Sequence, residues 1–373
     1  MAVHDDTVLG RARVQDNDAL EQYYKDLEGL NAGALWTVAN KIEPWEPTTS
    51  SDAVLWSYET LRPYVLRATE LVTPEQAGRR VVWLANPRRR DVAATCGWLY
   101  SGLQVMLPGE YASAHKHAAS ALRFILEGEG AYTVVNGEKT LLGARDFVIT
   151  PSGTWHDHGN EGEAGPAIWQ DGLDIPFVNA LDANYYAIYQ ETEDGRQAPD
   201  RALDYSAKRY VGSGLLPEGE TWSARYSPLL RFPWDRTYES LLELASIDEG
   251  SPYDGTLLRY VNPLTGGHVM PTMGAHIQRL REGQALAAHR HTGNIIYTVA
   301  KGSGHSIVGG RRFDWSERDV FCVPSWTWHE HANGSQSEDA VLFSFSDLPV
   351  IESLGLYMEQ ALEDNGGHQE VSA

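Results

Sequence analysis

The chain has 373 residues, with 30 Lys or Arg against 51 Asp or Glu, so its formal net charge is −21. This acidic balance argues against nucleic-acid binding and requires a locally positive pocket for any anionic substrate. Because single cores stop growing at roughly 250–300 residues, we expect two cores. The start of the chain lacks a secretory signal and no apolar run could span a bilayer, which predicts a soluble cytoplasmic protein with no membrane partner. Two cysteines, Cys96 and Cys322, are too few for a disulfide framework.

Local patterns predict a mainly β protein with helices near both ends. Helical apolar spacing covers residues 18–30 and 350–363, and another helix is expected near residues 238–245. Strand-like runs at 123–126 and 131–135 flank a Gly-rich turn, and Asn136-Gly137 is a strong β-hairpin signal. The pattern returns at 295–299, with Gly309-Gly310 as a second hairpin turn. Residues 191–201 are polar and predict a loop.

An internal repeat organises the chain. At an offset of 174 residues, Gln104 aligns with Gln278, His115 and His117 with His289 and His291, and Gly128 and Gly130 with Gly302 and Gly304. After a one-residue deletion the offset is 173, and Trp155-His156 aligns with Trp328-His329 and His158 with His331. The series predicts two copies of a small antiparallel barrel of about 100 residues. We therefore expect a helical N-terminal arm (1–60), a first barrel (61–179), a connection (180–255), a second barrel (256–346), and a C-terminal helix and tail (347–373).

Each repeat carries three histidines at a spacing that suits a metal ion. Side chains alternate along a strand, so His115 and His117 should point to the same side, and His156 follows where the chain would return across the barrel. A single histidine is more often solvated or hydrogen-bonded within a core, but a repeated triplet favours metal binding. The second triplet consists of His289, His291 and His329.

The spacing Gly109-x5-His115-x-His117, followed by Pro151-x4-His156-x3-Asn160, resembles the two signature motifs of the cupin superfamily, and both motifs recur in the second half. The resemblance implies an all-β bicupin, with two tandem jelly-roll barrels. Many cupins add a glutamate ligand shortly after the second histidine, but here those positions are apolar in both copies: Ala121 and Leu122, and Ile295 and Ile296. The site therefore resembles the three-histidine variant, which disfavours an oxalate-decarboxylating bicupin.

A longer resemblance covers most of residues 35 to 350. It runs through Ala77-Gly-Arg-Arg-Val81, Leu84-Ala-Asn-Pro87, Ser101-Gly-Leu-Gln-Val105, Glu127-Gly-Glu-Gly130, Trp155-His-Asp-His-Gly-Asn160, Asp171-Gly-Leu-Asp-Ile-Pro176 and Arg259-Tyr-Val-Asn-Pro-Leu-Thr-Gly-Gly267. These motifs are similar to those of the gentisate/salicylate 1,2-dioxygenase family. Two segments depart from the family pattern, Arg88-Arg-Arg90 and Cys96-Gly-Trp98, and they bear on the substrate rather than on the chemistry.

The family resemblance implies an Fe(II)-dependent enzyme that cleaves a 2-hydroxybenzoate between its carboxyl-bearing and hydroxyl-bearing ring carbons with O2. Three neutral ligands leave Fe(II) its charge and open positions for the substrate oxygens and dioxygen. Gentisate, giving maleylpyruvate, is the favoured substrate; 5-nitro- or 5-chlorosalicylate, salicylate and 1-hydroxy-2-naphthoate are alternatives. One Fe(II) is expected per subunit of a homotetramer, in the first barrel. Two other classes remain open: a non-catalytic metal-binding bicupin, and a Mn or Zn isomerase or decarboxylase.

Two residues near the first triplet are candidates for direct substrate contact. Arg123, six residues after His117, should share its face and clamp the substrate carboxylate, with an internal ion pair as the alternative. His158 should donate to the phenolic oxygen or act as an acid or base, unless it is bonded to the backbone. The second copy has Tyr297 in place of Arg123, so its triplet is expected to bind a metal and catalyse little.

Four further residues complete the predicted site. The family motif implies that Arg79 reaches the substrate carboxylate while Arg80 points away, and that Asp171 orients His158 or an arginine. Gln104 recurs in the second copy, so a structural hydrogen bond competes with a substrate contact. Tyr100 is assigned to the pocket wall, with ordinary packing as the alternative.

Overall fold

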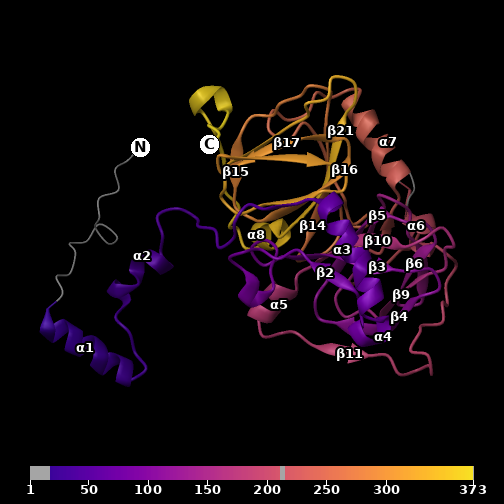
Figure 1. Ribbon diagram of the computed structural model, residues 1–373, viewed down its shortest axis with the longest axis horizontal. Helices are drawn as coiled ribbons and strands as arrows, with labels where there is room; N and C mark the ends of the chain where they lie inside the picture. The colour runs from indigo at the N-terminus through magenta and orange to yellow at the C-terminus, as the bar shows by residue number, and fades with distance from the viewer. Residues whose placement is uncertain (1–16, 211–214, 373) are drawn as a thin grey trace. The chain divides into compact units, whose positions relative to one another are not determined.

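The computed structural model describes residues 17–210 and 215–372, and the chain divides into two units, Met1–Thr48 and Thr49–Ala373. The first unit contains α1 (Asp18–Gly29), the 3-10 turn η1 (Leu35–Thr37) and α2 (Ala39–Ile42) (Figure 1). Helix α1 confirms the helix predicted over residues 18–30. Its N-cap Asn17 accepts a hydrogen bond from the Leu20 N–H at 3.1 Å, which satisfies a backbone donor that the helix leaves free. Residues 1–16 of the predicted arm lie outside the described residues.

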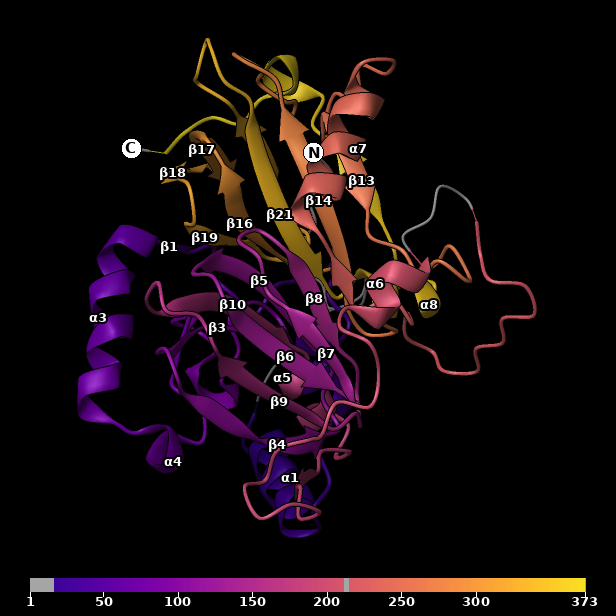
Figure 2. The ribbon, with the colours of Figure 1, turned by 90° about the vertical axis from the view of Figure 1, so that its right-hand side faces the viewer.

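The second unit contains two β-barrels, here called barrel 1 and barrel 2 (Figures 1 and 2). In barrel 1 a six-stranded sheet has the order β12-β8-β5-β10-β3-β2, and a five-stranded sheet has the order β11-β4-β9-β6-β7. The strands are β2 (Val81–Trp83), β3 (Tyr100–Met106), β4 (Tyr111–His117), β5 (Ala121–Glu127), β6 (Ala131–Val135), β7 (Glu138–Leu141), β8 (Phe147–Thr150), β9 (His156–Asn160), β10 (Ala167–Leu173), β11 (Tyr186–Ile188) and β12 (Arg231–Phe232).

Barrel 2 repeats this architecture with a six-stranded sheet, β1-β19-β16-β21-β14-β13, and a five-stranded sheet, β18-β17-β20-β15-β22. Its strands are β1 (Leu55–Trp56), β13 (Thr256–Arg259), β14 (Gly274–Leu280), β15 (His289–His291), β16 (Ile295–Lys301), β17 (Ser303–Val308), β18 (Arg311–Ser316), β19 (Val320–Val323), β20 (His329–Ala332), β21 (Ala340–Ser346) and β22 (Glu359–Ala361). The matching strand orders confirm the predicted pair of antiparallel barrels.

The two hairpin turns form where the sequence predicts them. Asn136 and Gly137 join β6 to β7 with φ angles of 45° and 79°, and Gly309 and Gly310 join β17 to β18 with φ angles of 59° and 76°. Positive φ at both central residues is the geometry of a tight two-residue hairpin, which Asn and Gly adopt at little steric cost. These turns set the register of the strands on either side.

The six-stranded sheets of the two barrels meet along a shared apolar core. Phe124 on β5 stacks on Phe343 on β21 with ring centroids 4.3 Å apart, and Phe147 on β8 lies 5.3 Å from Phe343. All three side chains are fully buried, and their cluster continues through both barrels. A smaller cluster fills each barrel, as the expected two cores require, and the largest cluster joins the barrels. Burial of the facing apolar sheets stabilises this arrangement.

Helices cover the outer surfaces of the barrels. Helix α3 (Tyr58–Leu71) packs on β3, and α7 (Trp234–Ala245) packs on β13 and β14 (Figure 2). Helix α7 contains the helix predicted near residues 238–245. The remaining short elements are α4 (Pro74–Ala77), η2 (Arg90–Val92), α5 (Ile175–Ala180), α6 (Tyr205–Tyr210), α8 (Leu348–Ser353) and η3 (Asp364–Gly367). Within the described ranges, no helix is both long enough and apolar enough to cross a membrane.

Three predictions about the segments outside the barrels differ from the structure. The helix predicted over residues 350–363 is wrong: α8 ends at Ser353, and the chain then forms β22, which pairs with β15. The edge of β15 offers backbone partners to this segment, and such tertiary pairing overrides helical spacing. Residues 49–60 belong to the second unit rather than to the arm, because β1 pairs with β19. The predicted connection contributes β11 and β12 to the two sheets of barrel 1.

Candidate metal centre and active-site cavity

Two neighbouring strands of barrel 1 bring three histidines together. His115 and His117 lie on β4, and His156 begins β9 directly opposite His115. The ring centroids are 5.2 Å apart for His115 and His117, 4.1 Å for His115 and His156, and 4.9 Å for His117 and His156. One potential ligand atom from each residue lies within 4.8 Å of the others, and in residues 17–210 and 215–372 no other set of His, Cys, Asp or Glu meets this condition. The three imidazoles can therefore hold one metal ion.

The hydrogen bonds of His117 and His156 leave their Nε2 atoms free to bind a metal ion. Nδ1 of His117 donates to the carbonyl oxygen of Ala119 at 2.7 Å, and Nδ1 of His156 donates to that of Thr154 at 3.0 Å. A carbonyl oxygen only accepts, so each Nδ1 carries the proton and each Nε2 keeps its lone pair. Burial lowers the pKa of all three histidines, for His115 to about 2. The rings are thus neutral at physiological pH, the form that binds metal ions.

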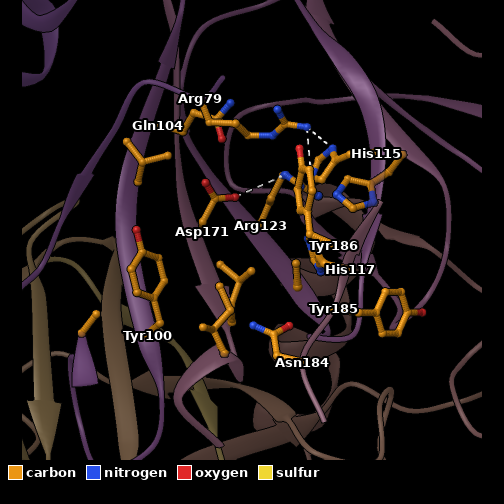
Figure 3. Close-up of a pocket in the computed structure, with 16 residues that line it drawn as sticks. Arg79, Tyr100, Gln104, His115, His117, Arg123, Asp171, Asn184, Tyr185 and Tyr186 are labelled. Atoms are coloured by element: carbon orange, nitrogen blue, oxygen red, sulfur yellow. Dashed lines mark hydrogen bonds and ion pairs between the residues drawn. The ribbon is translucent and has the colours of Figure 1, made fainter. Parts of the chain in front are cut away.

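A cavity of about 390 Å³ lies beside the triad (Figure 3). Its charged lining consists of Arg79, Arg123 and Asp171, and its other walls include Val81, Tyr100, Gln104, Leu173 and Ile175. Two guanidinium groups against one carboxylate give the lining a net positive charge in a strongly acidic chain. This is the local environment that an anionic ligand requires. The size and the largely apolar walls suit a small aromatic acid with one charged end.

Arg123 lies at the centre of a buried polar network. Its Nη1 donates to Oγ1 of Thr150 at 2.6 Å, its Nη2 lies 3.0 Å from Nε2 of His158, and its Nε forms an ion pair with Asp171 at 3.3 Å. The internal ion pair that the sequence left as an alternative is therefore present, and Arg123 also lines the cavity. Burial lowers the pKa of Arg123, an effect that Asp171 opposes. Burial likewise raises the pKa of Asp171 to about 6, although Arg123 acts in the opposite direction.

Arg79 and Arg80 point in different directions, as expected. Nη2 of Arg79 contacts the ring of His115, at 3.2 Å from its Nε2 (Figure 3). Its Nη1 donates to the carbonyl oxygen of Gly78 at 3.0 Å. Burial lowers the pKa of Arg79 to about 10. Arg80 is turned away from the cavity and pairs with Glu110. Arg79 thus places a second guanidinium next to the triad.

His158 is not part of the cavity wall. The side chain is completely buried, its Nε2 faces Arg123, and its Nδ1 has no hydrogen-bond partner among the described residues. Burial, followed by the charge of Arg123, holds the pKa of His158 well below its usual value. His158 thus reaches the cavity through Arg123, whose guanidinium contacts its Nε2 and lines the cavity.

The repeated glutamines differ between the barrels. Gln104 on β3 lines the cavity of barrel 1. In barrel 2, Nε2 of Gln278 donates to the backbone oxygen of Asp254 at 2.8 Å, which is a structural hydrogen bond. Tyr100 also lines the cavity, as predicted, and burial raises the pKa of its hydroxyl group.

The second triplet lies at the equivalent place in barrel 2 in a more open arrangement. The rings of His289 and His291 are 5.7 Å apart, while His329 lies 4.4 Å from His289 and 5.1 Å from His291. All three side chains are buried. Unlike those of the first triplet, its potential ligand atoms do not all lie within 4.8 Å of one another.

Sequence reasoning missed the cavity wall contributed by the segment before and within β11. Tyr186 stacks on His115 with ring centroids 5.1 Å apart, and Asn184 and Tyr185 also line the cavity. We expected only a connection here. The repeat contained a signal for this wall, because at the offset of 173 residues Tyr186 corresponds to Glu359. Tyr186 pairs with His117 on β4, and Glu359 pairs with His291, the counterpart of His117, on β15.

Two segments of the chain, residues 102–176 and 276–346, match the model of the cupin domain. Gentisate 1,2-dioxygenase 1 from Aquipseudomonas alcaligenes is 37% identical over 91% of this chain and 95% of its own length. The 5-aminosalicylate 1,2-dioxygenase from Comamonas sp is 36% identical over 95% of this chain and 93% of its own length. The crystal structure of salicylate 1,2-dioxygenase from Pseudoaminobacter salicylatoxidans with gentisate has a TM-score of 0.86 at 30% identity, covering 93% of this chain and 95% of that chain.

Proposed function

Because this chain belongs to the family of gentisate and salicylate 1,2-dioxygenases, we propose that it cleaves the aromatic ring of a 2-hydroxybenzoate with dioxygen. The bond between the carboxyl-bearing and hydroxyl-bearing carbons breaks, and both oxygen atoms enter the product. We assign gentisate as the substrate and maleylpyruvate as the product. The observation that carries the proposal is the cavity in barrel 1, where three neutral imidazoles lie beside two guanidinium groups.

We assign one Fe(II) per chain to His115, His117 and His156. The donor set fits such an ion, because Nε2 of His117 and of His156 is free and because all three rings are neutral. When bound, Fe(II) supplies a Lewis-acidic, redox-active centre with open positions for the substrate oxygens and for dioxygen. Binding and orientation of the substrate and exclusion of water are left to the protein side chains.

Arg123 holds the substrate carboxylate in this proposal. Its guanidinium lines the cavity, and its contacts with Thr150 and Asp171 fix its plane before substrate arrives. Such a preorganised fork matches the two oxygens of a carboxylate with parallel charge-assisted hydrogen bonds. Arg79 adds a second positive charge on the side of His115 (Figure 3). The carboxylate charge of the substrate is thus neutralised where the cavity lining is net positive.

Two buried groups act through Arg123. Asp171 is assigned as a positioning residue, because its carboxylate pairs with Nε of Arg123 and restrains the guanidinium. His158, predicted as a catalytic acid or base, is reassigned to the same role, since its neutral Nε2 accepts from Nη2 of Arg123. We place Gln104 and Tyr100 against the substrate ring, with Leu173 and Ile175 among the apolar walls that exclude water.

The substituent at position 5 of the ring is the variable part of the assignment. A 5-nitro- or 5-chlorosalicylate, salicylate and 1-hydroxy-2-naphthoate remain the alternative substrates. The cytoplasmic location, the homotetrameric assembly and the domain boundaries within the second unit stay predictions from the sequence.

The test is anaerobic reconstitution of the apoprotein with Fe(II), followed by addition of dioxygen and a panel of these 2-hydroxybenzoates. We expect dioxygen uptake equal to substrate loss, a ring-cleavage product spectrum, and the highest kcat/KM for gentisate. The Zn(II)-loaded protein and the His156→Ala variant serve as inactive controls. Full Fe(II) occupancy without turnover of any of these acids would contradict the proposal and favour a non-catalytic metal-binding bicupin.

A further inference from the structure

Barrel 2 retains its three histidines but lacks the residues that bind an anion in barrel 1. On β16, Tyr297 stands where Arg123 stands on β5, and its cross-strand partner is Ser344 rather than an aspartate. Tyr253 stacks on His289 with ring centroids 5.3 Å apart, in the place where an arginine contacts the first triad. The two positions that supply guanidinium groups in barrel 1 are thus tyrosines in barrel 2, so neither position offers a cation to an acidic aromatic substrate.

The orientation of the three rings matches that of metal ligands. Nδ1 of His291 donates to the carbonyl oxygen of Thr292 at 3.1 Å, and Nδ1 of His329 donates to that of Thr327 at 3.0 Å. Both Nε2 atoms are thus left with free lone pairs, as in the first triad. The same bond types on the same ring atoms in both barrels indicate that the two triplets are prepared for the same kind of ligand.

His289 is oriented by carboxylates instead of by the backbone. Its Nδ1 lies 3.2 Å from Oε1 of Glu359, and its Nε2 lies 3.8 Å from Oδ1 of Asp254. A carboxylate behind the ring nitrogen that faces away from the ion is a common support for a metal-bound histidine. Two ligands of a tetrahedral ion with bonds of about 2.1 Å lie about 3.4 Å apart, so Asp254 is close to the position of a fourth ligand.

The C-terminal segment, residues 354–372, is built onto this triplet. It supplies Glu359 to His289, and Tyr357 stacks on His291 with ring centroids 6.3 Å apart. The Thr292 N–H donates to the carbonyl oxygen of residue 358 at 2.9 Å, and β22 pairs with β15 over all three of its residues. Two of the three histidines are thus held by the segment that follows the barrel.

We propose that His289, His291, His329 and Asp254 bind a second divalent first-row cation, best matched by Zn(II), and that this ion is structural. Nitrogen and carboxylate ligands in a set of four suit Zn(II). Binding draws the three rings together and, through Glu359, fastens the C-terminal segment to barrel 2. The metal site of barrel 1 then adjoins a positively lined cavity, whereas that of barrel 2 is supported by the carboxylates of Glu359 and Asp254. This inference does not depend on the proposed ring cleavage.

The test measures Zn(II) content after loading and desalting. We expect about two ions per chain in the wild type, about one in His156→Ala and almost none in His156→Ala/His329→Ala. His305→Ala, which removes a partly exposed histidine of β17 outside the set, is the matched control and should retain the ion of barrel 2 in the His156→Ala background. Asp254→Asn should weaken binding at least tenfold in that background. Circular dichroism shows whether each variant is folded.

The structural role has its own measurement, which is limited proteolysis of the C-terminal segment in folded His156→Ala protein. We expect cleavage within residues 354–372 to be at least tenfold slower with Zn(II) than with a chelator, and the protection to vanish in His156→Ala/His329→Ala. Absence of Zn(II) from folded His156→Ala, or equal binding with and without His329, overturns the site. Bound Zn(II) that leaves proteolysis unchanged overturns the fastening role. Neither measurement uses turnover, and the decisive comparisons are made in the His156→Ala background, so the result does not depend on ring cleavage in barrel 1.

Discussion

Replacing Arg123 with methionine tests the carboxylate clamp directly, because methionine keeps much of the side-chain length and removes the charge. The wild-type guanidinium is buried and contacts Thr150 at 2.6 Å, His158 at 3.0 Å and Asp171 at 3.3 Å. The substitution therefore affects both substrate binding and the stability of the protein, and the experiment must separate these effects. The metal ligands are untouched, so metal content should stay unchanged.

The expected loss of activity follows from the strength of the contact. A hydrogen bond to a charged group contributes about 1.5–3 kcal/mol, and each ~1.4 kcal/mol is a factor of ten, so kcat/KM should fall about ten- to a hundredfold or more. For stability, the variant leaves Asp171 buried without its cation. Burial already raises the pKa of Asp171 to about 6, and loss of Arg123 raises it further. The protonated carboxyl group is tolerated, so destabilisation is small near pH 6 and grows as the pH rises.

The assay compares anaerobic binding of gentisate with that of hydroquinone, which is gentisate without its carboxylate. Arg123→Met should weaken gentisate binding about tenfold or more and change hydroquinone binding little. Arg123→Met/Asp171→Asn is the control, and it should recover stability without recovering affinity for gentisate. Equal weakening of both ligands, or recovery of kcat/KM in the double variant, would show that Arg123 is structural and would refute the clamp.

Four other outcomes are expected. His156→Ala should lose both the metal of barrel 1 and turnover, measured by metal analysis and dioxygen uptake; normal activity would rule out the assigned triad. The pKa of Asp171 is about 6 and its charged form restrains the Arg123 guanidinium, so kcat/KM should fall as the pH drops through 6. If Asp171→Asn showed the same fall at low pH, titration of Asp171 would not be its cause. Tyr186→Ala removes a ring whose centroid lies 5.1 Å from that of His115. Since such stacking contributes about 0.5–1.5 kcal/mol, a chelator should remove the metal of barrel 1 roughly two- to tenfold faster. An unchanged rate would show that Tyr186 does not stabilise the metal site. Phe343→Ala opens the core shared by the barrels and should destabilise the protein by about 3–5 kcal/mol in urea unfolding, so a loss below ~1 kcal/mol would argue against that core.

The sequence alone determined the features that depend on short stretches of chain. Alternation along a strand placed His115 and His117 on one side, and the repeat identified two barrels with equivalent histidine triplets. Asn136-Gly137 predicted its hairpin because the required positive φ angles are a property of the two residues themselves. These conclusions needed no knowledge of distant contacts, since the backbone preferences and the spacing of the ligands act locally.

Only the tertiary structure decided which segments meet across long distances in sequence. Helical spacing over residues 350–363 gave way to β22 because the edge of β15 was available for pairing, and Tyr186 reached the metal site by the equivalent pairing in barrel 1. His158 has the spacing of a substrate-binding residue, yet Arg123, from another strand, takes its Nε2. The free energy of an edge hydrogen bond or a buried polar contact depends on the partner that folding brings there, and neither a residue nor its neighbours in sequence specify that partner.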